Sequence, residues 1–274
     1  MPDPDAIVAA VASAAKYRTL CVESIRRVAQ REIAAQPAAG SKALVKATKR
    51  RLHQVYGAFE EKVDYAGILA QLEAAYQGGS QSEIEAICRR ALAVHHSTRE
   101  RLPLLDRFFP DIWAITGRPR ALLDLGCGLN PLALPWMGLG AGTRYVALDI
   151  DQERVRFLNR TLALAGMLPL ARCQDVLVRP PDDPADVALL LKMSPTLERQ
   201  EPGATARLLE ALHAPFAVVS FAVKSLGGRE KGMAATYQRR FLELAGARQW
   251  TVSRLGFETE LVFVVQCQVG RGQR

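Results

Sequence analysis

The sequence predicts an α/β protein in which an all-helical N-terminal part precedes a mostly parallel sheet. Two observations lead to this prediction. Up to about residue 116, apolar side chains recur at helical spacing. After Gly117, short apolar runs of strand length alternate with helical stretches, which is the pattern of parallel strands joined by helices. We therefore expect two domains, at residues 1–116 and 117–274.

The helices of the first half are predicted from periodicity and from candidate capping residues. Residues 21–33 carry apolar side chains at helical spacing, with arginines largely on the other faces. Ser41 and Asp64 are candidate N-caps for the next two helices. Ser82 and Glu85 have the spacing of a capping box and predict the start of a further helix.

The second half is predicted to hold a sheet of seven strands. The strand-like runs are residues 121–125, 145–149, 171–173, 187–191, 217–223, 250–253 and 261–268. Helical stretches lie at 131–138, 152–165 and 205–212. The last two strand-like runs follow one another without a helical stretch, so we expect them to pair antiparallel.

Composition excludes several classes of protein. The longest apolar runs are strand-length and too short to cross a bilayer. No basic stretch near the N-terminus leads into an apolar one, so we expect no signal peptide, a cytoplasmic location and no membrane partner. None of the five cysteines forms a C-x-x-C pair, which argues against a zinc site or a disulfide framework. We expect no metal and infer no obligate protein partner.

Positive charge is concentrated near the N-terminus. The whole chain has a net charge of +8, and residues 12–60 hold ten Lys or Arg against three Glu, a net +7. Such a basic segment favours a polyanionic partner. Structured RNA is the candidate, with contacts expected from bases that would point outward on one helix: Lys42, Lys46, Lys49, Arg50 and Arg51.

A glycine-rich turn follows the first predicted strand, in the order Asp124-Leu-Gly126-Cys-Gly128. Glycines there permit a tight turn and the close approach of a ligand. The turn lacks the third glycine of a dinucleotide-binding fingerprint, and the chain has no Gly-Lys-Ser/Thr for a nucleoside triphosphate. A carboxylate at this place would repel a pyrophosphate but suits the cationic amino and sulfonium groups of S-adenosylmethionine.

Two more acidic residues follow the next two predicted strands. Asp149 can accept hydrogen bonds from both ribose hydroxyls, and Asp175 can accept one from an adenine amino group. Ile150 and Val176 lie beside them in sequence and could enclose the adenine ring. The three strand ends together predict one S-adenosylmethionine site. Their order resembles that of the class I (Rossmann-like) methyltransferase fold, whose sheet has an antiparallel last strand.

The residues also bear on the type of methyl transfer. Leu191-Lys-Met-Ser-Pro195 stands where exocyclic-amine methyltransferases carry an Asn/Asp-Pro-Pro-aromatic turn. None of the cysteines adjoins a proline, as a pyrimidine C5 nucleophile usually does. A purine ring nitrogen with its own lone pair remains, and such an atom needs positioning rather than a general base.

Three longer segments resemble a specific family. His95 to Arg101, Lys192 to Glu201 and Lys224 to Met233, together with Asp124 to Pro131, are similar to the aminoglycoside-resistance 16S rRNA guanine N7 methyltransferases of actinomycete producers and resistant pathogens. The similarity spans nearly the whole chain. It implies methylation of guanine N7 in the decoding A-site of the assembled 30S subunit, and resistance to drugs of the kanamycin and gentamicin class.

The resemblance also implies roles for single residues. Arg101 would bind the methionine carboxylate of the cofactor, as a guanidinium can do with two hydrogen bonds. His95, His96 and Ser97 would line the same pocket. The loop after the fourth strand would face the cofactor and the target base with Lys192, Gln200 and Glu201. Residues 193–196 in this loop depart from the family's pattern. The basic residues of the loop after the fifth strand would bind RNA phosphates; these are Lys224, Arg229 and Lys231.

Two alternative activities remain open at this point. The same fold could methylate a neighbouring A-site adenine at N1. It could also be a small-molecule methyltransferase of antibiotic biosynthesis, which would not need the basic helical segment. A protein that binds RNA without catalysis is disfavoured by the complete set of Asp124, Asp149 and Asp175.

Overall fold

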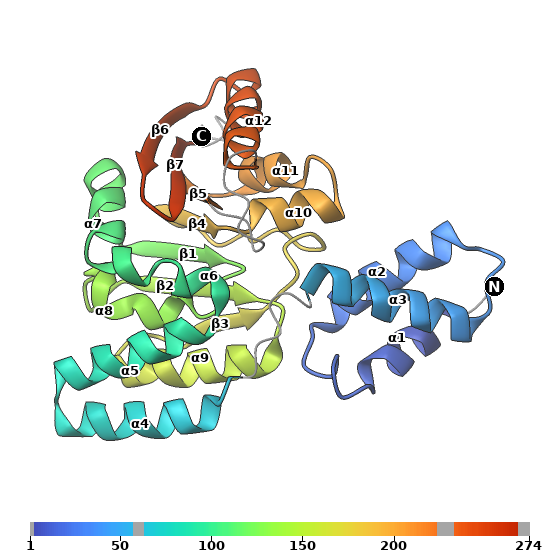
Figure 1. Cartoon of the computed structure of the whole chain (residues 1–274), viewed down its shortest axis with the longest axis horizontal. Coiled ribbons are helices and arrows are strands. Elements are labelled where there is room, and N and C mark those ends of the chain that lie inside the picture. Colours follow the sequence, from blue (N-terminus) through green and yellow to red (C-terminus); the bar gives the residue numbers. More distant parts are fainter. Residues whose placement is uncertain (1–2, 57–62, 224–232, 268–274) are drawn as a thin grey trace.

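The computed structural model describes residues 3–56, 63–223 and 233–267, and its centre is a seven-stranded sheet (Figure 1). The strands run in the order β3-β2-β1-β4-β5-β7-β6. Their bounds are β1 Ala121–Leu125, β2 Arg144–Asp149, β3 Leu170–Cys173, β4 Val187–Leu191, β5 Phe216–Ala222, β6 Thr251–Gly256 and β7 Glu260–Gln266. Strands β1 to β5 pair in parallel, and β7 runs antiparallel to both β5 and β6. The predicted fold class, with its antiparallel last strand, is confirmed.

Helices cover both faces of the sheet, and its central strands β1, β2, β4 and β5 are buried on both sides. Alternate side chains of one strand enter different cores, as Leu122 and Leu123 of β1 do. One face carries α4 Tyr65–Gly78, α5 Gln81–Val94, α7 Leu105–Thr116, α8 Leu134–Met137 and α9 Gln152–Leu164. The other carries α10 Ser194–Gln200, α11 Ala204–Ala211 and α12 Met233–Ala247. Short helical turns lie at α6 His96–Arg99, Leu102–Leu104 and Asn130–Ala133.

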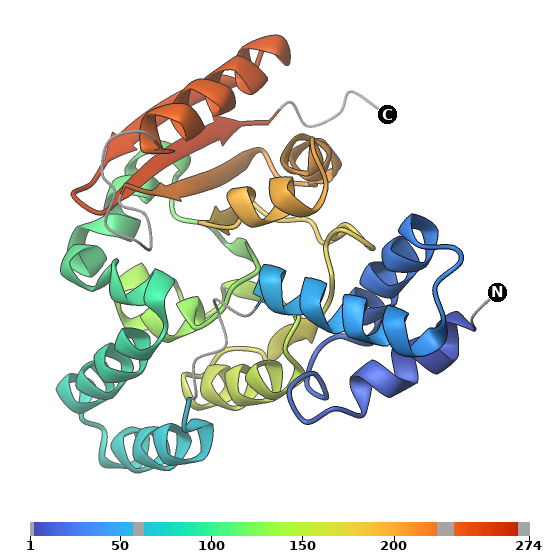
Figure 2. The same ribbon diagram turned by 45° about the vertical axis from the view of Figure 1, so that its right-hand side comes forward.

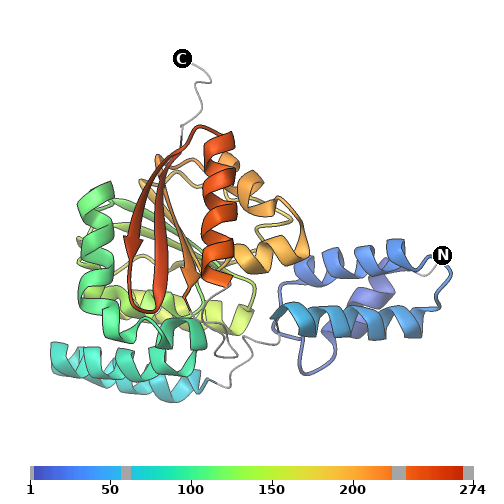
Figure 3. The ribbon, with the colours of Figure 1, turned by 45° about the horizontal axis from the view of Figure 1, so that its top comes forward.

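The first three helices form a unit with a core of its own. These are α1 Pro4–Ala12, α2 Val22–Ala35 and α3 Ser41–Tyr56, and Ile25, Leu44 and Leu52 are completely buried between them. We call residues 4–56 the helical unit. It stands as a lobe beside the sheet, next to α9 and α10, in all three views (Figures 1, 2 and 3). By contrast, α4 to α7 share a core with the sheet. The predicted division at residue 116 follows the change of secondary structure rather than the division of the cores.

An extended segment ties the helical unit to the sheet. Leu20 forms a β-bridge with Asp151, directly after β2. The amide of Cys21 donates to the carbonyl of Ile150, and the amide of Gln152 donates to the carbonyl of Thr19, each at 2.7 Å. The helical unit is therefore fixed to the strand end that carries Asp149.

The helix starts show one confirmed cap and two wrong ones. Ser41 is the first residue of α3 rather than its N-cap, because the amide of Leu44 donates to the carbonyl of Gly40. Asp64 caps α4 by accepting from the amide of Gly67 at 2.9 Å, as predicted. The capping box expected at Ser82 and Glu85 is not formed. Helix α5 begins two residues earlier, where Ser80 accepts from the amide of Glu83. Gly79, in the left-handed conformation (φ +67°), ends α4 and leaves Ser80 extended, so the next helix starts at once.

Candidate cofactor-binding cleft

A cavity of about 730 Å³ lies at the carboxyl ends of the parallel strands, between the sheet and the helical unit. Ligands bind at this edge in open α/β sheets. The predicted cofactor residues that line it are His95, Ser97, Gly126, Gly128, Asp149, Ile150, Asp175, Val176, Lys192 and Gln200. The structure therefore gathers residues from positions 95 to 200 around one cleft. His96, Arg101, Asp124 and Glu201 are not part of its lining.

The glycine turn after β1 closes one side of the cleft. Gly126 and Gly128 have φ of +59° and +53°, a left-handed conformation that other residues adopt only with strain. A Cβ atom at Gly126 would lie 2.8 Å from the sulfur of Met193. The turn therefore needs glycine both for its backbone and for the space that Met193 fills.

Asp149 is held by four hydrogen bonds at the end of β2. One carboxylate oxygen accepts from the amide of Gly128 and the other from the amide of Asp151, each at 2.9 Å. The guanidinium of Arg154 donates to both oxygens, at 3.0 and 3.1 Å. Asp149 thus couples the glycine turn to the start of α9, and Arg154 supplies its counter-charge inside the cleft.

Asp175 is bound by the helical unit. Its carboxylate accepts from the Nε of Arg27 on α2 at 3.1 Å and from the amide of Leu177 at 2.9 Å. The amide of Asp175 donates to the carboxylate of Glu23, also on α2, at 2.6 Å. A residue predicted to contact adenine is thus fixed from the N-terminal helices.

Asp124 lies behind the glycine turn. It is 1% exposed and accepts from the side chains of Asn130 at 2.8 Å and Tyr145 at 2.7 Å. Burial raises the pKa of Asp124 to about 6, against the lowering effect of these two hydrogen bonds. Because β1 places it at the penultimate position of the strand, its side chain points into the core and supports the turn through Asn130.

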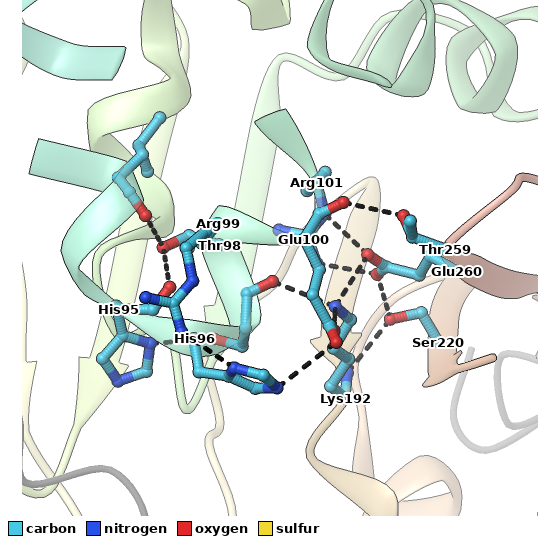
Figure 4. A network of polar contacts seen from close by, with 12 residues as sticks. His95, His96, Thr98, Arg99, Glu100, Arg101, Lys192, Ser220, Thr259 and Glu260 are labelled. Carbon is cyan, nitrogen blue, oxygen red and sulfur yellow. Dashed lines mark hydrogen bonds and ion pairs between the residues drawn. The ribbon is translucent and has the colours of Figure 1, made fainter. Parts of the chain in front are cut away.

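Arg101 also lies behind the cleft, in the polar network of Figure 4. Its guanidinium donates to both oxygens of Glu260, at 2.7 and 3.1 Å, and to Asn130 at 2.9 Å. Lys192 lies 3.5 Å from the same glutamate. Burial opposes ionisation of Glu260, but the charges of Arg101 and Lys192 outweigh it and lower the pKa of Glu260. The sequence did not predict Glu260 as a partner of Arg101.

Lys192 has an unusual backbone at the end of β4. Its φ is +58°, rare for a residue with a side chain. Its amide donates to the Ser220 hydroxyl, and its ammonium donates to the Ser97 carbonyl at 3.0 Å and the Glu100 carboxylate at 2.6 Å. Lys192 thus connects the His95–Arg101 segment to β4 and β5.

The two histidines differ in environment. His95 is 4% exposed, its Nδ1 lies 2.9 Å from the Ser97 hydroxyl, and burial lowers the pKa of His95 to about 4. It is therefore neutral near pH 7. His96 points away from the cleft lining and lies 3.3 Å from Glu100 (Figure 4).

Gln200 and Glu201 end α10 on different sides. The side-chain oxygen of Gln200 accepts from Arg27 at 2.6 Å and from the Tyr56 hydroxyl at 3.1 Å. Burial raises the pKa of Tyr56. Glu201, which does not line the cleft, lies 3.1 Å from Arg207, 3.5 Å from Arg27 and 3.6 Å from Arg31.

The predicted RNA-contacting residues lie partly outside the described residues. Lys42, Lys46, Arg50 and Arg51 are exposed on α3, and Lys49 is half-buried. Lys224, Arg229 and Lys231 fall outside the described residues. Within the described residues, no helix combines the length and apolar character needed to cross a bilayer. In that same part of the chain, no cluster of His, Cys, Asp and Glu side chains is placed to hold a metal ion.

Sequence reasoning missed two arginines: Arg154, which lines the cleft, and Arg27, which contacts cleft residues without being part of the lining. Arg27 and Arg154 each pair with a predicted cofactor residue. Arg154 stands five residues after Asp149, within the first turn of α9, and this spacing is a signal that could have identified it. Nothing in the sequence separates Arg27 from its neighbour Arg26, which is 44% exposed and pairs with Asp5.

Comparisons with known proteins agree over the full length. A family model described as "Ribosomal RNA methyltransferase (FmrO)" matches residues 13–264. A 16S rRNA (guanine(1405)-N(7))-methyltransferase of Micromonospora echinospora is 40% identical over 264 residues, 96% of each chain. A Frankia casuarinae protein of the same name is 41% identical over 265 residues, covering 96% of this chain and 93% of that protein.

Solved structures are similar to the same extent. The crystal structure of the 16S rRNA methyltransferase RmtF in complex with S-adenosyl-L-homocysteine is 36% identical, with a TM-score of 0.81, covering 98% of this chain and 100% of that one. An rRNA methylase from Escherichia coli is 29% identical, with a TM-score of 0.78, covering 97% and 100%. From the near-complete match of the family model and of relatives at 40% identity, this chain belongs to the ribosomal RNA methyltransferase (FmrO) family.

Proposed function

We propose that this chain transfers the methyl group of S-adenosylmethionine to N7 of guanine 1405 in 16S rRNA, the reaction for which its relatives are named. One observation carries the proposal. Asp149 and Asp175 follow neighbouring strands and line one cleft with Gly128, and the chain that builds this cleft matches those relatives over nearly its whole length.

The cleft fits the proposed cofactor. Its volume of about 730 Å³ is in the range of small-molecule sites. We assign the ribose hydroxyls to Asp149 and the adenine amino group to Asp175, with Ile150 and Val176 beside the adenine ring. Binding of the ribose by Asp149 would require the guanidinium of Arg154 to leave acceptor positions that it now fills. Gly128 permits the close backbone approach that a side chain would prevent. His95, Ser97, Lys192 and Gln200 form further parts of the wall.

The residues behind the cleft have a supporting role in this proposal. Asp124 and Arg101 both bind Asn130, which follows the glycine turn, so they fix the turn rather than the ligand. Direct binding of the cofactor carboxylate by Arg101 would require its guanidinium to leave Glu260. His96 and Glu201 stand further out and pair with charged neighbours.

The chemistry asks for positioning more than for a base. Bound S-adenosylmethionine supplies an electrophilic methyl group, and guanine N7 attacks with a lone pair and has no proton to lose. The chain then has to hold the base in line and exclude water. The lowered pKa of His95 makes it a weak base, and burial raises the pKa of the Cys127 thiol, so both agree with a site that uses neither a histidine base nor a thiolate nucleophile.

The helical unit is proposed to dock on folded rRNA. The exposed lysines and arginines of α3 would contact phosphates. The basic residues at positions 224, 229 and 231 would add contacts near the target nucleotide. The substrate is proposed to be the assembled 30S subunit in the cytoplasm. N7-methylguanine carries a fixed positive charge, which opposes polycationic drugs of the kanamycin and gentamicin class at that base.

Transfer of labelled methyl from S-adenosylmethionine to purified 30S subunits tests the proposal, with naked 16S rRNA as control. Borohydride–aniline cleavage maps N7-methylguanine, and we expect it at guanine 1405 of the 30S substrate. A reverse-transcription stop at a neighbouring adenine, without aniline cleavage, would instead establish the N1 activity. Labelling of neither RNA would favour a small-molecule substrate and overturn the proposal.

A further inference from the structure

Arg27 of the helical unit contacts three residues that line the cofactor cleft, although it does not line the cleft itself. Its Nε donates to Asp175 at 3.1 Å, and its Nη2 donates to Gln200 at 2.6 Å and to the Tyr56 hydroxyl at 3.1 Å. Asp175, Gln200 and Tyr56 all line the cleft. The Arg27 side chain is 10% exposed and that of Asp175 4% exposed, so the pair is little screened by water.

The same helix also fixes the backbone of Asp175. Glu23 lies one helical turn before Arg27 and accepts from the amide of Asp175 at 2.6 Å. Asp175 is thus held by α2 at two points, through its amide and through its carboxylate. The bridge between Leu20 and Asp151 fixes the start of α2 against the neighbouring strand end.

These hydrogen bonds leave Asp175 able to accept one more in a set direction. A carboxylate offers about four acceptor positions. One oxygen accepts from the amide of Leu177, and the other lies within 3.1 Å of both Nε and Nη2 of Arg27. We take the remaining acceptor position on the first oxygen as the one offered to an amino group in the cleft. The rotation of the carboxylate, which decides the direction of that position, is set by Arg27 together with the amide of Leu177.

We propose that Arg27 is a positioning residue through which the helical unit sets the adenine selectivity of the cofactor site. The inference rests on the proposed function, because it takes Asp175 as the acceptor of the adenine amino group. The helical unit is then a structural part of the cofactor site as well as the proposed RNA-docking unit. Without Arg27, Asp175 would keep its place in the chain but lose the partner that orients its carboxylate.

A loss of selectivity distinguishes this role from a loss of stability. S-Inosylhomocysteine differs from S-adenosylhomocysteine by a carbonyl oxygen in place of the 6-amino group, and this oxygen would face the Asp175 carboxylate. A site whose acceptor is placed to bind an N–H group of the ligand strongly rejects an analogue that lacks this group. Partial unfolding would weaken the binding of both ligands by one common factor and leave their ratio unchanged.

The experiment measures dissociation constants of both ligands by titration calorimetry for wild type, Arg27→Gln, Arg27→Lys and Arg26→Gln. We expect wild type to prefer S-adenosylhomocysteine by at least about tenfold, and Arg27→Gln to lose most of that preference. Arg26 is the matched control on the same helix, and Arg26→Gln should keep the wild-type ratio. Arg27→Lys should fall between, since a lysine offers a point charge without the planar fork.

Each outcome bears on a different claim. A wild-type ratio retained in Arg27→Gln overturns the inference and leaves the proposed function standing. If Arg27→Gln does not fold, Arg27→Lys decides the question by the same ratio. Wild type that binds neither ligand overturns the cofactor assignment itself. Wild type that binds both ligands equally removes the adenine contact of Asp175, and the inference with it, while labelling of 30S subunits still tests the methyl transfer.

Discussion

Arg101 and Glu260 form a two-pronged ion pair inside the protein, with side chains 3% and 0% exposed and a shortest N–O distance of 2.7 Å. The pair joins the segment before β1 to the start of β7, so it closes the structure between residues far apart in sequence. The Arg101 guanidinium also lies over the Phe108 ring, 4.6 Å from its centre.

Removing one partner of this pair should be costly. Arg101→Ala leaves the Glu260 carboxylate buried without its main partner, and we expect the free energy of unfolding to fall by about 3–5 kcal/mol. Urea denaturation measures it. Arg107→Ala is the matched control, because Arg107 also lies over a phenylalanine ring but pairs with Glu258 at the surface. That variant should lose less than about 1 kcal/mol. Equal losses would contradict the structural role of Arg101.

The raised pKa of Asp124 predicts a dependence of stability on pH. Because the pKa rises from 3.8 to about 6 on burial, the folded protein holds this proton more tightly than the unfolded chain does. The stabilisation is fully present below about pH 4 and is lost as the pH rises through 6. Asp124→Asn has no proton to lose. The free energy of unfolding of Asp124→Asn, relative to that of wild type, should therefore rise by roughly 3 kcal/mol between pH 4 and pH 7. Parallel pH curves for the two proteins would refute this.

The glycine turn predicts a clash that a second substitution can relieve. Gly126→Ala would place a Cβ 2.8 Å from the Met193 sulfur at a φ of +59°. Gly166→Ala serves as control, because Gly166 has a φ of +73° and nothing within 4 Å of its Cβ position. That control should lose about 1–2 kcal/mol from backbone strain alone. We expect Gly126→Ala to lose more stability than this in thermal or urea unfolding. Adding Met193→Ala to Gly126→Ala should restore only the part of the loss that exceeds that of the Gly166→Ala control. If the double variant is no more stable than Gly126→Ala, the loss of stability does not come from a clash with Met193.

Asp149 should be needed for cofactor binding. Asp149→Asn removes the charge of an acceptor assigned to the ribose hydroxyls, and we expect binding of S-adenosylhomocysteine to weaken by about 1–3 kcal/mol. Calorimetry gives the value. Asp186→Asn is the control, because Asp186 accepts from the amides of Arg120 and Ala121 at the opposite edge of the sheet. Unchanged affinity in Asp149→Asn would withdraw the ribose assignment.

The basic surface of α3 should matter for the ribosome and not for the cofactor. Changing Lys46, Lys49 and Arg50 together to Gln should weaken 30S binding and reduce the salt dependence of log K by about 0.7–0.9 for each phosphate that is no longer neutralised. Filter binding at several salt concentrations measures both quantities. Arg118→Gln with Arg120→Gln, before β1, should leave both unchanged. Normal 30S binding by the triple variant would show that α3 is not the docking surface.

The sequence was sufficient to predict the order of elements and the approximate place of the site. The seven strand-like runs correspond to β1 to β7, and the acids at positions 149 and 175 do line one cleft. Strand alternation, glycine turns and strand-end residues are local features. The parallel arrangement then brings the ends of successive strands to the same edge.

The exact start of α5 was not predictable in the same way. Both Ser80 and Ser82 precede a glutamate at the spacing of a capping box or close to it. Which of the two serines caps α5 depends on where α4 ends. The structure shows that α4 ends at Gly79, and the pattern of residues does not. Caps compete over one or two residues with small differences in free energy.

The sequence by itself determined the alternation of strands and helices, the glycine bend and the acids at the strand ends, because these follow from the conformational preferences of neighbouring residues. The tertiary structure alone decided that Arg27 rather than Arg26 binds Asp175, and that Arg101 binds Glu260. Their partners lie 148 and 159 residues away. A charged side chain becomes buried only where a partner compensates its loss of hydration, and for these two arginines only the folded chain brings that partner close.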